Sequence, residues 1–452
     1  IRQNHVGDWG LPIAMVTAKL MQLEAAGKDV SALTLDDLEK LYKAAQKECD
    51  ADEAGLAMVR RYSLGPKAEA EIGTQVEEAR EHLARAKATL VKLQAHDPAT
   101  YAVWKRIAEV TMKACLANCA RLGAIVLDEH SAGESSYADE LAPMVDELVR
   151  MGITEESDGA LVIRVQGFEE PCIIRKSDGG FLYATTDMAA VRRRVQKFGA
   201  DRVIYCVDAR QGLHFKQVFG AAHRAGFDVV PGHKEPSSLE HAAFGTILGQ
   251  DGKPFKTRTG ESVKLADLLD EAVERAERAV AEKASDLDPA ERRDVAEAIG
   301  IAAIKYADLS NDRIKDYVFD FDRMLAFEGN TGPYLMYAAV RIRNIFRKGG
   351  VDAATFARAP MTLAAKEEKD LALAILRYPG AVRAVAQWLE PHRLCQYLYD
   401  LASAFSGFYT NCPVLAAPDE ATKASRLRLC AITQRVLEDG LGLLGIRAIE
   451  RM

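Results

Sequence analysis

The sequence predicts an α/β protein in which an open parallel sheet carries a helical insertion and is followed by an all-α bundle. Three short apolar runs in residues 177–264 each lead into a polar loop, and the first two of these loops open amphipathic helices. Long stretches with apolar residues at helical spacing flank this region on both sides. Ligands of open α/β sheets bind beyond the carboxyl ends of the strands and at helix N-termini, so we expect the site in residues 177–264.

The composition is that of a globular protein with two or three domains. The chain has 452 residues, of which 48% are hydrophobic and 28% charged. No apolar run approaches the roughly 20 residues of a membrane helix, and no secretory signal is visible. Among eight scattered cysteines only Cys115 and Cys119 are close, one helical turn apart, so we expect reduced thiols, a cytoplasmic location and no metal site.

The charges are unevenly distributed along the chain. Residues 331–452 hold 16 Lys and Arg against 11 Asp and Glu, a net charge of +5, whereas the whole chain has a net charge of −7. A basic C-terminal part fits a domain that faces a polyanion, although chance asymmetry explains these charges equally well. The chain begins at Ile1 without an initiator Met, which predicts that an N-terminal portion precedes it.

The residues before the central region predict mainly helices. After a loop in which Asp8 is expected to cap a helix, apolar spacing predicts a helix over Leu11–Ala26. A helical insertion should occupy about residues 30–122, with a long charged helix over Glu69–His96 and its partner over Thr100–Leu122. The next expected elements are a strand over Gly123–Asp128, a helix over Tyr137–Met151 and two strands within Ala160–Ile174.

The residues after the central region predict only helices. Two helices are expected over Val263–Ala284 and Pro289–Leu309, and the break FEGNTGP then places a domain boundary at about 328/329. The sequence therefore predicts an α/β domain over residues 1–328 and an all-α domain over residues 329–452. The helices of the second domain are expected at Tyr334–Lys348, Ala365–Leu376, Pro379–Leu389, Pro391–Phe408 and Ala421–Leu437.

Three groups of residues in the central region are candidates for chemistry. Tyr183 and Asp187 lie four apart at a helix start, where a phenol and a carboxylate suit a guanidinium ligand; alternatively Asp187 only stabilises the helix N-terminus. Gln211 and His214 follow the strand VIYCV at the start of the next helix, where backbone N–H groups and an imidazole suit a nucleotide, although a structural His is the commoner case.

The third group is a basic loop between glycines. Residues 249–260 read GQDGKPFKTRTG and carry the cations Lys253, Lys256 and Arg258. Such a loop suits the clamping of a phosphate during its transfer, and an exposed hairpin tip is an equally good interpretation.

Taken together, these motifs resemble the bacterial arginyl-tRNA synthetases, a family of class I aminoacyl-tRNA synthetases. The resemblance covers the whole chain, from NHVGDWG through SDGGFLYATTD, ADRVIYCVDARQGLH and GKPFKTRTG to KYADLS, FEGNTGPYLMYAAVRIRNIFRK and the terminal ERM. It implies a Rossmann-type catalytic domain followed by a DALR-type anticodon-binding domain. It also implies that the protein joins arginine to the tRNA for arginine through arginyl-adenylate. The other substrate would be ATP together with Mg²⁺. No tightly bound cofactor is expected, and the protein would be a monomer.

The resemblance also assigns roles to residues. Tyr183, Asp187 and Gln211 would bind arginine, with Asp187 facing the guanidinium. His214, Phe255 and Lys256 would bind ATP, and Lys256, Arg258 and His214 would act in catalysis, because FKTRTG stands where other class I enzymes have KMSKS.

The resemblance implies two regions of tRNA contact. Asp8 and Trp9, with Gly10, would lie near the acceptor end. Phe408, Tyr409 and Asn411 would contact the anticodon by stacking and hydrogen bonding.

Two features depart from the family pattern. The match to KMSKS is poor in spacing and in its second lysine. The HIGH motif, expected ahead of NHVGDWG, is absent, so we expect this polypeptide alone to be inactive in adenylate formation. The alternative to an arginine–tRNA ligase is a noncatalytic tRNA-binding paralogue that kept the helical bundle.

Overall fold

The computed structural model describes residues 1–255, 264–283 and 287–451, and they form two compact units. Unit 1 consists of residues 1–120, 125–203 and 216–239, and unit 2 of residues 121–124, 204–215 and 240–452. This division differs from the domain boundary expected at 328/329, because unit 2 combines the helical bundle with several central segments. Each unit has apolar clusters of its own.

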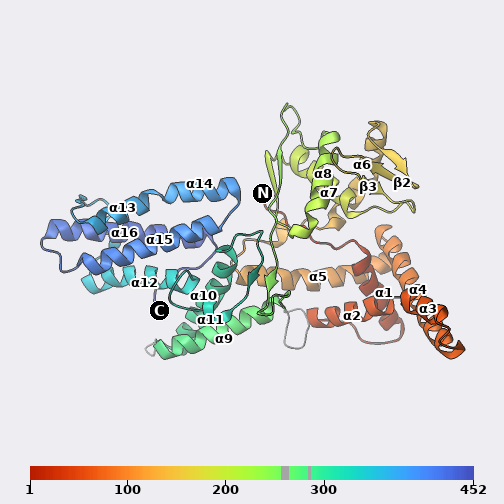
Figure 1. Ribbon diagram of the computed structural model, residues 1–452, viewed down its shortest axis with the longest axis horizontal. Coiled ribbons are helices and arrows are strands. Elements are labelled where there is room, and N and C mark those ends of the chain that lie inside the picture. The colour runs from red at the N-terminus through yellow and green to blue at the C-terminus, as the bar shows by residue number, and fades with distance from the viewer. Residues whose placement is uncertain (256–263, 284–286, 452) are drawn as a thin grey trace. The chain divides into compact units, whose positions relative to one another are not determined.

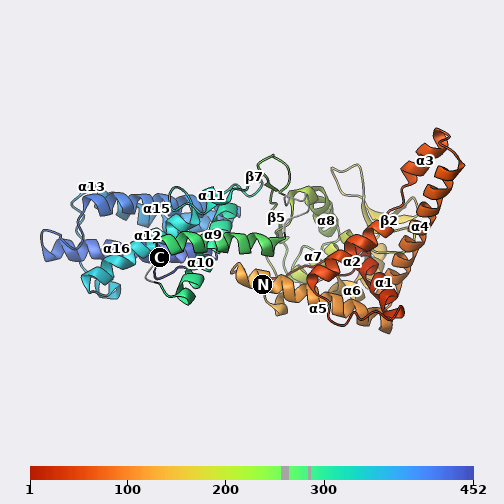
Figure 2. The same cartoon turned by 90° about the horizontal axis from the view of Figure 1, so that it is seen from below.

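The first half of unit 1 is helical, as the sequence predicts. Its helices are α1 (Leu11–Ala25), α2 (Leu35–Glu48), α3 (Glu53–Arg61), α4 (Pro66–Gln94) and α5 (Pro98–Arg121). The long α4 buries one stripe that includes Val76, Ala86 and Leu93, while its charged residues face outward. Helix α3 lies along α4 in both views (Figures 1 and 2). Helix α1 packs on both α2 and α4, so these helices form one layer of the unit.

The second half of unit 1 contains a small antiparallel sheet and helices α6 (Ala138–Arg150) and α7 (Tyr183–Arg192). The sheet order is β1 (Glu155–Ser157), β2 (Ala160–Ile163) and β3 (Cys172–Arg175), and α7 packs against β3. The turn between β1 and β2 is Asp158-Gly159, with φ of 50° and 76°. Positive φ at both positions is the type I′ hairpin pattern, so the DG pair was the sequence signal for the unpredicted strand β1.

The strand expected at Gly123–Asp128 is not formed. Gly123 has a φ of +62°, and a Cβ there would meet the carbonyl oxygen of Gly445 at 2.9 Å. The segment is therefore shaped by close backbone contact rather than by a sheet, and a 3₁₀ turn follows at Asp128–His130. The apolar run FLYATTD also lacks a strand, since Leu182 is an extended cap and Tyr183 already begins α7.

The parallel pairing that the sequence predicts occurs in two short pieces. Strand β4 (Arg202–Tyr205) pairs with β5 (Ser238–His241). The Ser238 N–H donates to the Asp201 carbonyl and the Ala242 N–H to the Tyr205 carbonyl. The two strands are therefore parallel, because both partners advance by four residues in the same direction. Strand β6 (Ile247–Leu248) pairs in parallel with β7 (Tyr317–Val318). Helix α8 (Gly212–Arg224) follows β4, so the strand–loop–helix order of the prediction is confirmed.

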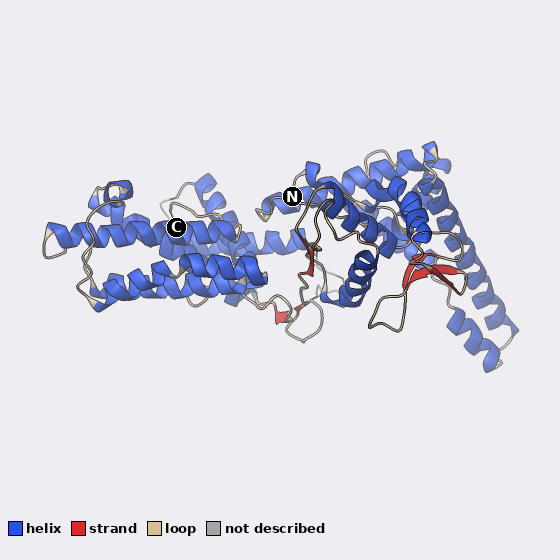
Figure 3. Cartoon of the chain, turned by 90° about the horizontal axis from the view of Figure 1, so that it is seen from above, coloured by secondary structure: helices blue, strands red, loops and turns tan. Residues whose placement is uncertain are grey.

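The rest of unit 2 is helical (Figure 3). It comprises α9 (Leu265–Lys283), α10 (Pro289–Leu309), α11 (Phe321–Met324), α12 (Gly332–Gly349), α13 (Lys366–Leu376), α14 (Tyr378–Trp388), α15 (His392–Asn411) and α16 (Glu420–Leu443). Helices α9, α10, α12, α13, α15 and α16 share one apolar core. Among the described residues after 329 there is no strand, which confirms the predicted all-α bundle.

Candidate functional site

A hollow beside the start of α7 brings together two of the predicted site residues, Trp9 and Tyr183. It has a volume of about 270 Å³ and belongs entirely to unit 1. Tyr183, which is 56% exposed, lines the hollow from the start of α7, and Trp9 lines it from the loop before α1. A Cβ on Gly10 would lie 3.3 Å from the Tyr183 hydroxyl, so glycine leaves room for this phenol. The lining residues are Trp9, Gly10, Leu11, Leu90, Gln94, Glu134, Leu141, Lys176, Phe181, Leu182, Tyr183 and Thr186.

Glu134 places a buried carboxylate in the wall of this hollow. The residue is only 8% exposed. Burial, followed by the charges of Asp8 and Asp187, raises the pKa of Glu134 to about 7, although a hydrogen bond from the Trp9 backbone N–H opposes the shift. Near neutral pH the group is therefore poised between its charged and neutral forms, and a cation in the hollow would favour the charged form.

Asp8 supports the loop instead of capping a helix. Its carboxylate accepts hydrogen bonds from the Ser135 backbone N–H at 2.9 Å and from the Ser135 hydroxyl at 2.7 Å. The expectation that Asp8 caps the first helix is wrong, because the cap position of α1 is Gly10 and no side chain bonds there. The carboxylate thus joins the N-terminal loop to the turn that carries Glu134.

Asp187 lies in the second turn of α7 and is 7% exposed. Its Oδ1 is 3.8 Å from Nε2 of His5. Burial lowers the pKa of His5, and Asp187 acts against that shift. Asp187 is not among the residues that line the 270 Å³ hollow, but its charge contributes to raising the pKa of Glu134 there.

Arg193 holds the Glu134 segment against the end of α7. Its guanidinium lies 3.7 Å from the ring centre of Tyr137 and pairs with Glu140 at 2.8 Å. It also donates a hydrogen bond of 2.5 Å to the carbonyl of Ser136. Arg193 begins a π-helical turn, a feature that often accompanies functional sites.

In unit 2, the end of β4 presents the predicted nucleotide-binding segment. Asp208 accepts hydrogen bonds from the backbone and the guanidinium of Arg210, which lower the pKa of Asp208 to about 2. This turn delivers Gln211, an exposed residue, to the position just before α8. His214 lies in the first turn of α8 with its ring 5.1 Å from that of Phe215. The backbone N–H groups at this helix start suit an anion.

The predicted basic loop begins as a tight hairpin. Gly249 N–H donates to the Lys253 carbonyl at 2.8 Å, and Phe255 N–H donates to the Ile247 carbonyl at 3.0 Å. The ring of Phe255 packs against Phe319, with centres 4.9 Å apart. Lys256 and Arg258 lie outside the described residues. The hairpin-tip interpretation therefore describes residues 249–255 well, and it leaves the role of the cations as a prediction.

The predicted arginine-binding set is divided between the units. Tyr183 and Asp187 belong to unit 1, and Gln211 belongs to unit 2 with His214. A second hollow, of about 340 Å³, lies within unit 2 between α10, β7, α11 and the start of α12. It contains none of the predicted site residues.

Two family models match this chain in sequence order. The class I tRNA synthetase (R) catalytic domain matches residues 1–321, and the DALR anticodon binding domain matches residues 335–452. The chain belongs to the arginyl-tRNA synthetase family.

Individual relatives agree with this family. The arginine–tRNA ligase of Haemophilus influenzae (strain PittEE) is 43% identical, and the alignment covers 100% of this chain and 74% of that protein. The ligase of Pseudomonas syringae pv. syringae is 44% identical over 100% of this chain and 72% of that protein. Among solved structures, the Plasmodium falciparum arginyl-tRNA synthetase matches with a TM-score of 0.80 at 28% identity, covering 100% of this chain and 70% of that one.

The DALR part of this arginyl-tRNA synthetase family member places the predicted anticodon residues differently. Phe408 is 0% exposed and belongs to the core of the bundle, so it cannot stack on a base as expected. Tyr409 is partly exposed, and the guanidinium of Arg341 lies 4.2 Å from its ring centre. Asn411, the last residue of α15, is exposed and donates to the Gly407 carbonyl at 3.0 Å.

Sequence reasoning missed Glu134, His5 and Arg341. The sequence of α12 gives no signal that singles out Arg341, and Glu134 follows a glycine in an irregular turn that has no periodic signal. Within the described part of the chain, no cluster of three or more His, Cys, Asp or Glu could hold a metal ion. None of the helices that the structure describes is long and apolar enough to cross a membrane.

Proposed function

We propose that this protein activates arginine with ATP, forms arginyl-adenylate and transfers the arginyl group to the tRNA for arginine. The observation that carries the proposal is the identity of 43–44% to arginine–tRNA ligases across 100% of the chain. The catalytic and anticodon-binding family models match in the order that such an enzyme needs.

The acidic groups of unit 1 support arginine as the amino acid. Asp187 and Glu134 are both largely buried, and the charge of Asp187 adds to the cost of charging Glu134. A guanidinium or an α-ammonium group placed between such carboxylates relieves that cost, because the ligand supplies the missing positive charge. We assign guanidinium binding to Asp187, with Tyr183 and Gln211 as further contacts.

The start of α8 and the basic loop support ATP. The helix start offers backbone N–H groups next to His214, which is an arrangement suited to the phosphates or the base of a nucleotide. We assign Phe255 and Lys256 to ATP, and Lys256 with Arg258 to the stabilisation of negative charge on the phosphates as the adenylate forms. Mg²⁺ would accompany ATP as part of that substrate.

Two regions support tRNA binding. Trp9 lines the hollow next to Tyr183, and we assign this hollow to the meeting of the acceptor end with activated arginine. At the other contact, the phenol of Tyr409 and the amide of Asn411 suit stacking and hydrogen bonding to unstacked bases. Asp8 would act through the loop that it holds, since both of its carboxylate oxygens already bond Ser135.

Arginine-dependent ATP–pyrophosphate exchange tests this proposal, with and without the cognate tRNA, on the protein as its gene encodes it. Arginine should stimulate exchange, and radiolabelled arginine should appear on the tRNA. A noncatalytic tRNA-binding paralogue would bind tRNA and show neither reaction. We also propose that the protein acts as a cytoplasmic monomer without a tightly bound cofactor, which light scattering and fractionation would check.

A further inference from the structure

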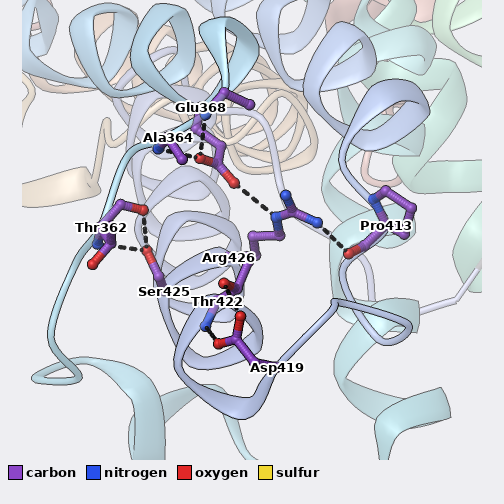
Figure 4. A network of polar contacts seen from close by, with 9 residues as sticks. Thr362, Ala364, Glu368, Pro413, Asp419, Thr422, Ser425 and Arg426 are labelled. Atoms are coloured by element: carbon purple, nitrogen blue, oxygen red, sulfur yellow. Dashed lines mark hydrogen bonds and ion pairs between the residues drawn. The ribbon is translucent and has the colours of Figure 1, made fainter.

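A largely buried guanidinium joins three segments of the helical bundle at the end of α15 (Figure 4). Arg426, in the second turn of α16, bonds Oε1 of Glu368 through Nε at 2.7 Å. Its Nη1 donates to the carbonyl of Pro413 at 2.8 Å. Pro413 follows Asn411 by two residues, so this bond fixes the chain just after α15 ends.

The carboxylate partner of Arg426 is fully engaged as well. The side chain of Glu368 is 1% exposed and that of Arg426 is 12% exposed. Oε2 of Glu368 accepts from the backbone N–H groups of Ala364 and Ala365 at 2.8 and 2.9 Å. Burial raises the pKa of Glu368, but the hydrogen bonds from Arg426, Ala365 and Ala364 outweigh burial and place the pKa below its ordinary value. The pair is therefore charged at neutral pH.

Neighbouring bonds make the first turns of α16 a rigid base for this arrangement. Asp419 caps the helix by accepting from the Thr422 backbone N–H at 2.7 Å. The Ser425 hydroxyl donates to the Thr362 carbonyl at 2.8 Å and accepts from the Thr362 N–H at 2.9 Å. Arg426 thus extends from a helix whose start is held on two sides, which leaves its guanidinium little freedom.

Stability alone is a weak explanation for this ion pair. A buried ion pair adds little net stability compared with apolar side chains of similar volume, because both charges lose their hydration. Its geometric effect is direct: the last turn of a helix frays unless something holds the chain that follows it. That last turn of α15 carries Tyr409 and Asn411.

We propose that Arg426 is a positioning residue for tRNA binding, which fixes the Pro413 segment and so keeps Tyr409 and Asn411 in place at the end of α15. The inference rests on the proposed function, in which these two residues contact the anticodon. Arg426 itself does not contact the tRNA. It acts through the backbone that it holds.

Replacement of Arg426 by lysine tests the proposal without leaving Glu368 unpaired, because a lysine keeps the charge but cannot reach both Glu368 and Pro413 with a planar fork. Arg426→Lys should raise the KM for tRNA about tenfold, which is the loss of about 1.4 kcal/mol of binding. At saturating tRNA, kcat and the KM values for arginine and ATP should stay within about twofold. Amide exchange at residues 408–412 should become faster. The double variant Glu368→Gln/Arg426→Gln, which removes both buried charges, should give the same pattern.

Arg343→Lys is the matched control. Arg343 pairs with Glu438 at 2.8 Å between α12 and α16, in the same bundle, and is also partly buried. Its lysine variant should lower the melting temperature without slowing or speeding exchange at residues 408–412 and without changing the KM for tRNA. An equal rise in this KM for both lysine variants would overturn the proposal, since general loosening of the bundle would then explain it.

Tyr409→Ala, assayed in parallel, separates the two proposals. If Tyr409→Ala raises the KM for tRNA and Arg426→Lys leaves both that KM and amide exchange at wild-type values, the positioning role is refuted and the anticodon contact stands. If Tyr409→Ala leaves the KM unchanged, the contact itself is wrong, and the positioning role falls with it.

Discussion

The indole Nε1 of Trp104 donates a hydrogen bond of 2.7 Å to the backbone carbonyl of Asp8, and so α5 holds the loop that precedes α1. The two tryptophans of this region meet edge to face, with the rings of Trp9 and Trp104 centred 5.3 Å apart. On the other side of the loop, the Trp9 N–H bonds Glu134 and Asp8 bonds Ser135. The helical insertion therefore supports one wall of the Tyr183 hollow.

Trp104→Phe should loosen this wall while keeping an aromatic ring in the cluster. The Asp8 carbonyl, which is partly buried, would lose its donor, at a cost of at most about 1–3 kcal/mol, the penalty for a buried acceptor left unsatisfied. We expect a lower melting temperature together with a raised KM for tRNA or arginine, measured in aminoacylation. Tyr101→Phe, in the same aromatic cluster, is the control and should leave both KM values at wild-type levels. Unchanged KM values for Trp104→Phe would disprove support of the hollow by α5.

Glu134→Gln should change the pH dependence of stability. The folded pKa of about 7 lies above the ordinary value of 4.5, so the folded protein holds this proton more tightly than the unfolded chain does. Stability from this group is complete below pH 4.5 and is lost as the pH rises to about 7. The neutral glutamine avoids that loss, and the variant should gain on the wild type by roughly 1.4 kcal/mol per unit of pKa shift at most.

Urea unfolding at pH 5 and pH 8 measures this difference. The advantage of Glu134→Gln should be larger at pH 8, and Glu129→Gln, on the same segment but exposed, should show no such change. In calorimetry near pH 7, arginine should release protons from the wild type and fewer from Glu134→Gln. A variant that is relatively less stable at pH 8 than at pH 5 would contradict the assignment.

Asp187→Asn should weaken arginine binding strongly and leave ATP binding nearly intact. Loss of the charge would leave a bound guanidinium without its main counter-charge, a penalty of about 2–5 kcal/mol for one partner of a buried pair. The KM for arginine should rise at least tenfold in ATP–pyrophosphate exchange, whereas Asp139→Asn on α6 should have no effect. Equal arginine affinity in wild type and Asp187→Asn would remove Asp187 from the site.

The parts of the fold with strong periodicity were predictable, and the irregular parts were not. The long charged helix predicted over residues 69–96 corresponds to α4 (Pro66–Gln94), and the helices predicted after residue 329 correspond to the bundle. The segment that begins at Gly123 is not a strand, because Gly123 has a φ of +62° and its backbone lies close to that of Gly445. Gly445 is more than 300 positions away in the sequence. Such contacts leave no local signal.

The candidate site shows the same contrast. Tyr183 and Asp187 could be named because both fall at a predicted helix start, where position along the chain indicates function. Phe408 was misassigned because its role came from the resemblance alone. The apolar residues Leu401 and Phe405 recur at helical spacing and place Phe408 on the buried face of α15, whereas Tyr409 is partly exposed. Glu134 gained its raised pKa from burial beside Asp8 and Asp187, which are distant in sequence.

The salt dependence of tRNA binding should distinguish the stacking contact of Tyr409 from the charge contact of Arg341. Charge contacts release counterions, so affinity falls as salt rises, with a slope that shrinks by about 0.7–0.9 for each lost phosphate contact. Tyr409→Ala should lower affinity by about tenfold, since one stacked base is worth about 1–3 kcal/mol, and should keep the wild-type slope. Arg341→Gln, which removes the guanidinium 4.2 Å from that ring, should reduce the slope. Filter binding of tRNA between low and moderate salt distinguishes the two variants. A salt-independent affinity in the wild type would exclude the basic bundle as the tRNA contact surface.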